Sequence, residues 1–284
     1  MLEYHEIVEF MKKMQAVAKE LDITVTGGMT TNAYLLSEDK LRQLVELNVV
    51  HYQITVDGLK DIHDTKRFLI SGRGSWDKIV QNLITAQKTD LDFVITVRTN
   101  FDTDLESDFT SYIEYMAGCF ADDLRFVFYF EAIKKLGGER DSALDTVNSE
   151  ANSCARFESF AVEKGLRVSR FNVLPFSAMC YASKENNLVI DVDGRLLKCT
   201  VRLESDDNVV GSLSDRSFDV LDAQLDRWTA YPLPKNCYGC DILSICYGRA
   251  CPPANIRNSG ESSDYCRNLV LSYKNSMAAA YPLA

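Results

Sequence analysis

The chain has 284 residues, enough for one large domain or two ordinary ones, and its 46% hydrophobic and 25% charged residues are typical of a soluble globular protein. It has no run of 18 or more apolar residues and no N-terminal secretory signal, so we expect a cytoplasmic protein without a membrane span. The net charge of −10 argues against nucleic acid as a partner, because phosphate binding needs clustered Lys and Arg.

The N-terminal part alternates between helical and strand patterns. Apolar residues at helical spacing predict a helix over 4–20, and a short β-rich run follows at 23–26. A second helix is predicted over 38–48. The β-branched run 49–56 then predicts a strand that ends at an Asp-Gly turn.

The same alternation continues toward the middle of the chain. The predicted elements, in order, are a helix at 76–89, a strand at 92–99, a helix at 107–119, a strand at 124–130, a helix at 143–164 and a strand at 168–171. Strands that alternate with helices at this spacing indicate parallel βαβ units and an α/β fold. A complete (β/α)8 barrel needs about 250 residues. We therefore expect a small open sheet or a partial barrel.

Composition changes after about residue 172. Helical periodicity fades, and Cys, Gly and Pro become frequent. We predict two domains, 1–172 and 173–284. In the second, Asp193-Gly194 between two short β-rich runs predicts a hairpin, and 265–280 predicts a closing helix.

Cysteines dominate the second domain. The chain has nine, an odd number that argues against a disulfide framework. Cys119 and Cys154 fall in helical patterns and are expected to be core residues. The other seven can fill one four-ligand site and leave three ligands for a second. Thiolates suit both zinc and iron–sulfur clusters, and the spacing alone leaves both open.

The spacing of these seven cysteines resembles the SPASM domain of radical S-adenosylmethionine (SAM, AdoMet) enzymes. Cys180, thirteen residues, Gly194, four residues and Cys199 match the first half of that pattern. A Cys-x2-Cys-x5-Cys run matches the second half, although the next cysteine, Cys251, comes one residue late in CYGRACP.

The resemblance implies two auxiliary [4Fe–4S] clusters. The outer cluster would take its ligands from Cys237, Cys240, Cys246 and Cys266. The inner cluster would take Cys180, Cys199 and Cys251, with its fourth position open or filled by a non-cysteine ligand.

The first domain resembles the later strands of the radical SAM barrel. Residues 30–36 are similar to the TNGxLL segment, with Ala33 in place of Gly, and 53–58 are similar to the SxDG segment. A HDxxR-like stretch and a Gly-x-Gly-Ser-Trp-Asp helix start follow in the family's order. By this resemblance, the residues that bind the cofactor AdoMet are Asn32, Thr55, Asp57 and Arg67, with Thr55 and Arg67 on its carboxylate. Without the resemblance, Asp57 would be a turn residue and Arg67 a solvated charge.

The CxxxCxxC motif that holds the SAM-cleaving cluster in this family does not occur in the sequence. We therefore expect an N-terminally truncated family member, a fragment or a degenerate relative, and leave open whether this chain is itself an enzyme. The implied parent function is a radical SAM/SPASM peptide or protein maturase, with a peptide substrate and an electron donor such as flavodoxin or ferredoxin.

Thr200 after Cys199 stands where sulfatase-maturing relatives carry an Asp base, which favours modification of ribosomal peptides (RiPP maturation). Two alternatives remain. One is a non-catalytic iron–sulfur module for electron transfer or peptide binding, and the other is a zinc-binding structural protein.

Overall fold

The computed structural model describes residues 3–133, 150–169, 179–203, 205–214, 217–230, 232–249, 251–252, 266–267, 269–271 and 273–274. The chain divides into two compact units, Met1–Ser169 and Arg170–Ala284. We call them the α/β unit and the cysteine-rich unit, and each is described by itself. No helix in the described ranges has the length and apolar character that crossing a bilayer would require.

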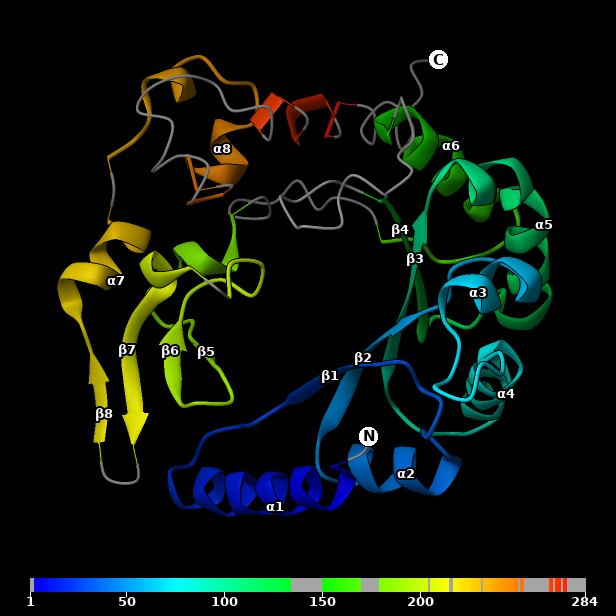
Figure 1. The fold of residues 1–284 in the computed structure, drawn as a ribbon, viewed down its shortest axis with the longest axis horizontal. Helices are drawn as coiled ribbons and strands as arrows, with labels where there is room; N and C mark the ends of the chain where they lie inside the picture. The colour runs from blue at the N-terminus through cyan, green and yellow to red at the C-terminus, as the bar shows by residue number, and fades with distance from the viewer. Residues whose placement is uncertain are drawn as a thin grey trace. The chain divides into compact units, whose positions relative to one another are not determined.

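The α/β unit is built on a parallel four-stranded sheet in the order β1-β2-β3-β4 (Figure 1). The strands are β1 Gly27–Thr31, β2 Val49–Thr55, β3 Val94–Phe101 and β4 Phe126–Ala132. The helices are α1 Tyr4–Glu20, α2 Glu38–Glu46, α3 Lys60–Lys66, α4 Trp76–Gln87, α5 Thr103–Phe120 and α6 Glu150–Glu163. The predicted α/β class with a parallel sheet is confirmed.

The two faces of this sheet differ. Alternate residues of β3 and β4, among them Ile95, Val97 and Phe128, are buried in one apolar cluster that the helices join. The residues between them are only half-buried, and most are polar, such as Arg98 and Tyr129. One face therefore forms the core, while the opposite face and the strand ends are available for a site.

The first strand corrects the sequence prediction. We expected it at 23–26, but the carbonyl of Val25 accepts hydrogen bonds from the side chains of Gln15 and Asn48, and β1 begins at Gly27. A Cβ on Gly27 would lie 2.9 Å from Val49 on β2. Glycine at this position therefore permits the close pairing of β1 with β2.

Two further expectations differ at their edges. The short helix α3 was not predicted, and the helix expected over 143–164 is described from α6 onward, with 143–149 outside the described residues. Of the strand expected at 168–171, Val168 forms a single parallel bridge to Phe128. Residues 170 and 171 lie outside the described residues.

The cysteine-rich unit contains an antiparallel sheet in the order β5-β6-β7-β8. Its elements are the strands β5 Val189–Ile190, β6 Arg195–Leu197, β7 Val209–Ser214 and β8 Ser217–Val220, the helices α7 Asp222–Thr229 and α8 Leu243–Cys246, and the 3-10 turns η2 Tyr181–Ser183, η3 Asp206–Asn208 and η4 Lys235–Cys237. The predicted hairpin is present as β5–β6, with Gly194 at φ +78°. Of the predicted helix over 265–280, the described residues 266–267, 269–271 and 273–274 are helical.

Candidate functional site

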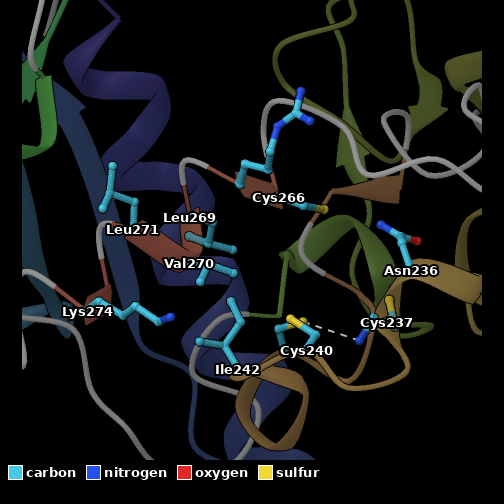
Figure 2. Close-up of a pocket in the computed structure, with 12 residues that line it drawn as sticks. Asn236, Cys237, Cys240, Ile242, Cys266, Leu269, Val270, Leu271 and Lys274 are labelled. Atoms are coloured by element: carbon cyan, nitrogen blue, oxygen red, sulfur yellow. Dashed lines mark hydrogen bonds between the residues drawn. The ribbon is translucent and has the colours of Figure 1, made fainter.

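The outer group of cysteines surrounds one cavity in the cysteine-rich unit. Cys237 and Cys240 lie on and after η4, Cys246 ends α8, and Cys266 lies in the C-terminal helical segment. All four line the same cavity of about 290 Å³. Figure 2 shows the labelled Cys237, Cys240 and Cys266 around this space.

The rest of the cavity wall is mostly apolar. Ile242, Leu269 and Val270 line it together with the cysteines (Figure 2), and Asn236 and Lys274 also contribute to the wall. The side-chain oxygen of Asn236 is buried without a hydrogen-bond partner among the described atoms. Four thiols beside a largely apolar wall form a donor set suited to a soft metal group.

The electrostatics of these thiols favour a bound cation. Burial, and then the negative charge of the neighbouring Cys246, Cys266 and Cys240, raises the pKa of Cys237 to about 11. Burial likewise raises the pKa of Cys246, although its sulfur accepts a hydrogen bond from the backbone N–H of Gly248 at 3.3 Å. Thiolates held this close repel one another unless a cation lies between them.

The turn after Cys246 brings the backbone close to the cavity. Tyr247 and Gly248 both adopt positive φ, at +54° and +70°. A Cβ on Gly248 would lie 2.5 Å from Leu233 and 3.4 Å from the sulfur of Cys237. Glycine at this position therefore avoids a clash with Leu233, and its N–H is able to reach the sulfur of Cys246.

The inner group, Cys180, Cys199 and Cys251, gathers at a second place in the same unit. The N–H of Cys180 donates to the carbonyl of Arg249, two residues before Cys251, at 2.9 Å. Burial, and then the charges of Cys251 and Cys199, raises the pKa of Cys180. Four of the seven cysteines thus line one cavity, and Cys180, Cys199 and Cys251 neighbour one another elsewhere in the same unit. Their assignment to two clusters, which the SPASM resemblance implies, stays a prediction.

Asn208 fixes the inner site, although no sequence motif points to it. Its fully buried side-chain oxygen accepts from the N–H groups of Lys198 and Cys199, and its nitrogen donates to the carbonyls of Cys199 and Arg202. The N–H of Val201 donates to the sulfur of Cys199 at 3.4 Å. The loop that carries Cys199 is thus held on both sides.

No described group of three or more His, Cys, Asp and Glu side chains converges on a point as the ligands of one metal ion do. A zinc ion draws its sulfurs to about 2.3 Å from a common centre. The thiolates of a [4Fe–4S] cluster bind four different irons, so their sulfurs stand farther apart. Four cysteines around one cavity provide enough thiolates for either kind of site.

In the α/β unit, Asp57 and Arg67 form a pair just beyond the end of β2. The Nε of Arg67 donates to Oδ2 of the buried Asp57 at 2.5 Å. The other oxygen, Oδ1, accepts from the backbone and side chain of Asn100 on β3, at 2.8 and 3.2 Å. Asp57 therefore links two strand ends and fixes the guanidinium of Arg67, whose side chain remains 39% exposed.

His63 connects the backbone of Asp57 to that of Arg67 through hydrogen bonds. It is fully buried, its Nδ1 accepts from the N–H of Asp57 at 3.1 Å, and its Nε2 lies 3.2 Å from the hydroxyl of Ser75. That hydroxyl donates to the carbonyl of Arg67 at 2.5 Å, so the network assigns a neutral ring with its proton on Nε2. Burial lowers the pKa of His63, which favours the neutral form.

The other two predicted cofactor residues are less constrained. Thr55, half-buried, is the last residue of β2 and pairs with Arg98 of β3. Asn32 is exposed, and its side-chain oxygen accepts from the N–H of Tyr34 in a local turn. Ala33 beside it adopts φ +57°, a conformation that favours the glycine of the TNGxLL pattern. The structure groups Thr55, Asp57 and Arg67 near the end of β2.

No protein-family model matches the chain, and no curated protein matches it in sequence. Its fold is similar to solved structures of anSMEcpe. Native anSMEcpe with bound AdoMet and Cp18Cys peptide is 16% identical with a TM-score of 0.67, over 96% of this chain and 80% of that one. Native anSMEcpe with bound AdoMet is 16% identical with a TM-score of 0.64, over 96% of this chain and 79% of that one. At this identity the similarity establishes the fold.

Proposed function

We propose that this chain is part of a radical SAM/SPASM enzyme that modifies a peptide or protein side chain. Its cysteine-rich unit would hold two auxiliary [4Fe–4S] clusters, and its α/β unit would bind the methionine end of AdoMet. The observation that carries the proposal is the division of seven cysteines into two sets, one of which lines a single cavity.

Cys237, Cys240, Cys246 and Cys266 would hold the outer cluster, and Cys180, Cys199 and Cys251 the inner one. Backbone N–H groups of Gly248 and Val201 already point at ligand sulfurs, an arrangement that tunes iron–sulfur sites. The clusters would supply electron transfer, and three cysteines would leave one inner iron for another ligand.

The end of β2 would receive the carboxylate of AdoMet. Because Asp57 fixes Arg67 through Nε, the two terminal nitrogens of the guanidinium remain for a planar, two-pronged contact with a carboxylate. Thr55 would add a hydroxyl donor at the same edge. In this arrangement Asp57 positions Arg67 and does not itself touch the anionic carboxylate.

The similarity to anSMEcpe, solved with AdoMet and a peptide, supports both ligands for this chain. The 284 residues contain no CxxxCxxC motif, so the proposal covers AdoMet binding and the auxiliary clusters, and not the cluster that cleaves AdoMet. A cytoplasmic location and a flavodoxin or ferredoxin as electron donor belong to the same proposal.

Metal analysis of the anaerobically reconstituted full chain tests the proposal. We expect about eight irons and eight sulfides per chain and a broad absorbance near roughly 400 nm, as two [4Fe–4S] clusters require. Cys240→Ala should lose about half of the iron by removing the outer cluster, and Cys180→Ala the other half.

Cys119→Ala is the matched control, because Cys119 lies in α5 of the α/β unit and belongs to neither set. Its iron content should equal that of the unmodified chain. Stoichiometric zinc and no iron would replace the proposal with the zinc-binding structural alternative. Equal iron loss in all three variants would disprove the assignment of ligands.

A further inference from the structure

Lys198 is a fully buried lysine that the proposed function does not use. Its ammonium donates to the carbonyls of Lys184 and Asn187, both at 2.6 Å. Within the described ranges, no carboxylate lies at ion-pair distance from it. Burial lowers the pKa of Lys198, while the nearby Cys180 and then Glu185 oppose that shift.

Lys198 connects the two segments that form the inner site. It directly precedes Cys199, and its two carbonyl partners belong to the turn that follows Cys180 and η2. One side chain therefore holds the Cys180 segment to the Cys199 segment. Both segments carry cysteines of the inner set, so Lys198 ties together the backbone on either side of that set.

A buried ammonium without a carboxylate partner is costly, by several kcal/mol per ion in proteins generally. Carbonyl dipoles offset only part of that cost, so a negative group nearby is expected. Three cysteine thiolates on an iron–sulfur cluster provide such a group, because the thiolate-bound cluster is an anion.

We infer that Lys198 is the buried counter-charge of the inner iron–sulfur group and a positioning residue that fixes Cys180 relative to Cys199. The inference rests on the proposed function. One-electron reduction adds one negative charge to the cluster, and a fixed positive charge in a water-poor site stabilises that reduced form. Lys198 therefore raises the reduction potential of the inner cluster.

The test is a reductive titration of the reconstituted full chain with dithionite, which supplies the electron, followed by electron paramagnetic resonance. Cys251→Ala, which removes the inner cluster, identifies its signal. Lys198→Met removes the charge and the donors, whereas Lys198→Gln removes the charge and keeps a donor. The matched control is Lys184→Met, because Lys184 also lies near Cys180 but its side chain is exposed to water.

We expect the inner cluster to be reduced at a more negative potential in both Lys198→Met and Lys198→Gln, with the outer cluster and Lys184→Met unchanged. An unchanged inner potential in both variants overturns the inference and leaves the proposed function intact. A folded chain that takes up no iron and sulfide overturns both.

Some neutral variants could fail to assemble the inner cluster. In that case Lys198→Arg, which keeps the charge, supports the inference if it restores the inner signal. It overturns the inference if the inner signal is also lost with the charge retained.

Discussion

The α/β unit and the cysteine-rich unit differ in what they bury. The described part of the α/β unit has one continuous apolar cluster with buried residues of β2, β3, β4 and several helices, against which Met29 of β1 packs. The described part of the cysteine-rich unit has two small clusters, and each contains a cysteine of one proposed metal site, Cys199 or Cys246. Apolar burial therefore stabilises the first unit, whereas the proposed function predicts that the second unit depends on the metal groups bound by its thiols.

Removing the proposed clusters should produce the largest difference in stability between the two units. Metal binding to a site that is not preformed contributes directly to folding. In the cluster-free chain we expect the backbone amides around η4 and α8 to lose their protection from hydrogen exchange, by at least about tenfold. Those of β2 and β3 should exchange as before. Hydrogen exchange with mass spectrometry compares both units in one sample.

Unchanged protection around α8 in the cluster-free chain would contradict this comparison, because the unit would then be stable through its small apolar clusters alone. Cys240→Ser in the outer set should act in the same direction. Cys154→Ser in α6 is the control that leaves both proposed sites intact.

A substitution in the apolar core should destabilise the α/β unit and leave the cysteine-rich unit unchanged. Phe109 of α5 is buried, stacks on Phe157 of α6 at 3.5 Å between ring centroids and contacts Phe101 and Phe130 edge-on. Phe109→Ala should therefore destabilise the α/β unit by about 3–5 kcal/mol, since it opens a cavity at an aromatic cluster. Urea unfolding followed by exchange of the β3 amides measures the loss.

Phe10→Ala is the control for Phe109→Ala. Phe10 of α1 is 60% exposed, so its removal should change stability by no more than about 0.5 kcal/mol. Neither substitution should alter the iron content of the cysteine-rich unit. Loss of iron in Phe109→Ala would show that the units do not fold independently.

The elements with strong periodicity were predictable. The helix over 4–20, the strand at 49–56 and the Asp-Gly hairpin lie where the sequence pattern places them, within a residue or two. The position of strand β1 could not be predicted from periodicity, because its register depends on parallel pairing with β2 and on the absence of a side chain at Gly27. Helix α3 lacks an apolar stripe and is fixed by its buried His63.

The candidate site residues also divide into those that a sequence pattern suggests and those that only the fold reveals. The two sets of cysteine ligands come from the resemblance to the SPASM pattern and stay a prediction, because spacing alone does not separate Cys251 from Cys246, five residues before it. The contributions of Asn100, Asn208 and Lys198 could not be predicted from the sequence. Each of these side chains contacts a segment that only the tertiary fold brings close to it. The sequence places Lys198 beside Cys199 but carries no signal that its ammonium is buried.

Replacing Arg67 should weaken AdoMet binding to the α/β unit without affecting the clusters. Charge-assisted hydrogen bonds contribute about 1.5–3 kcal/mol, so Arg67→Ala should raise the dissociation constant roughly tenfold to a hundredfold. Asp57→Asn should act in the same direction by releasing the guanidinium. Isothermal titration calorimetry under anaerobic conditions measures both.

Arg73→Ala is the matched control, because Arg73 lies in the same loop, is exposed and does not contact Asp57. Its affinity for AdoMet should equal that of the unmodified chain. If Arg67→Ala and Arg73→Ala bind AdoMet equally, the carboxylate site does not lie at the end of β2.

The smallest expected effect is a pH dependence confined to the α/β unit, where all three histidines lie. Burial lowers the pKa of His63 in the folded unit below its value of about 6.5 in the unfolded chain. Below that pH the unfolded chain binds the extra proton and the folded unit does not. The stability that neutral His63 contributes is therefore present above about pH 6.5 and is lost as the pH falls, by up to about 1.4 kcal/mol per pH unit.

Urea unfolding between about pH 7.5 and about pH 5.5 tests this, with exchange of the β2 amides as the reporter. His63→Asn keeps an acceptor for the N–H of Asp57 but cannot titrate, so its stability should fall less steeply with pH. His51→Gln, at an exposed position of β2, should retain the full slope of the unmodified chain. Equal slopes in His63→Asn and the unmodified chain would mean that the ring beneath Asp57 is not held neutral. The orientation of Arg67 would then have to depend on Asp57 and Asn100 alone.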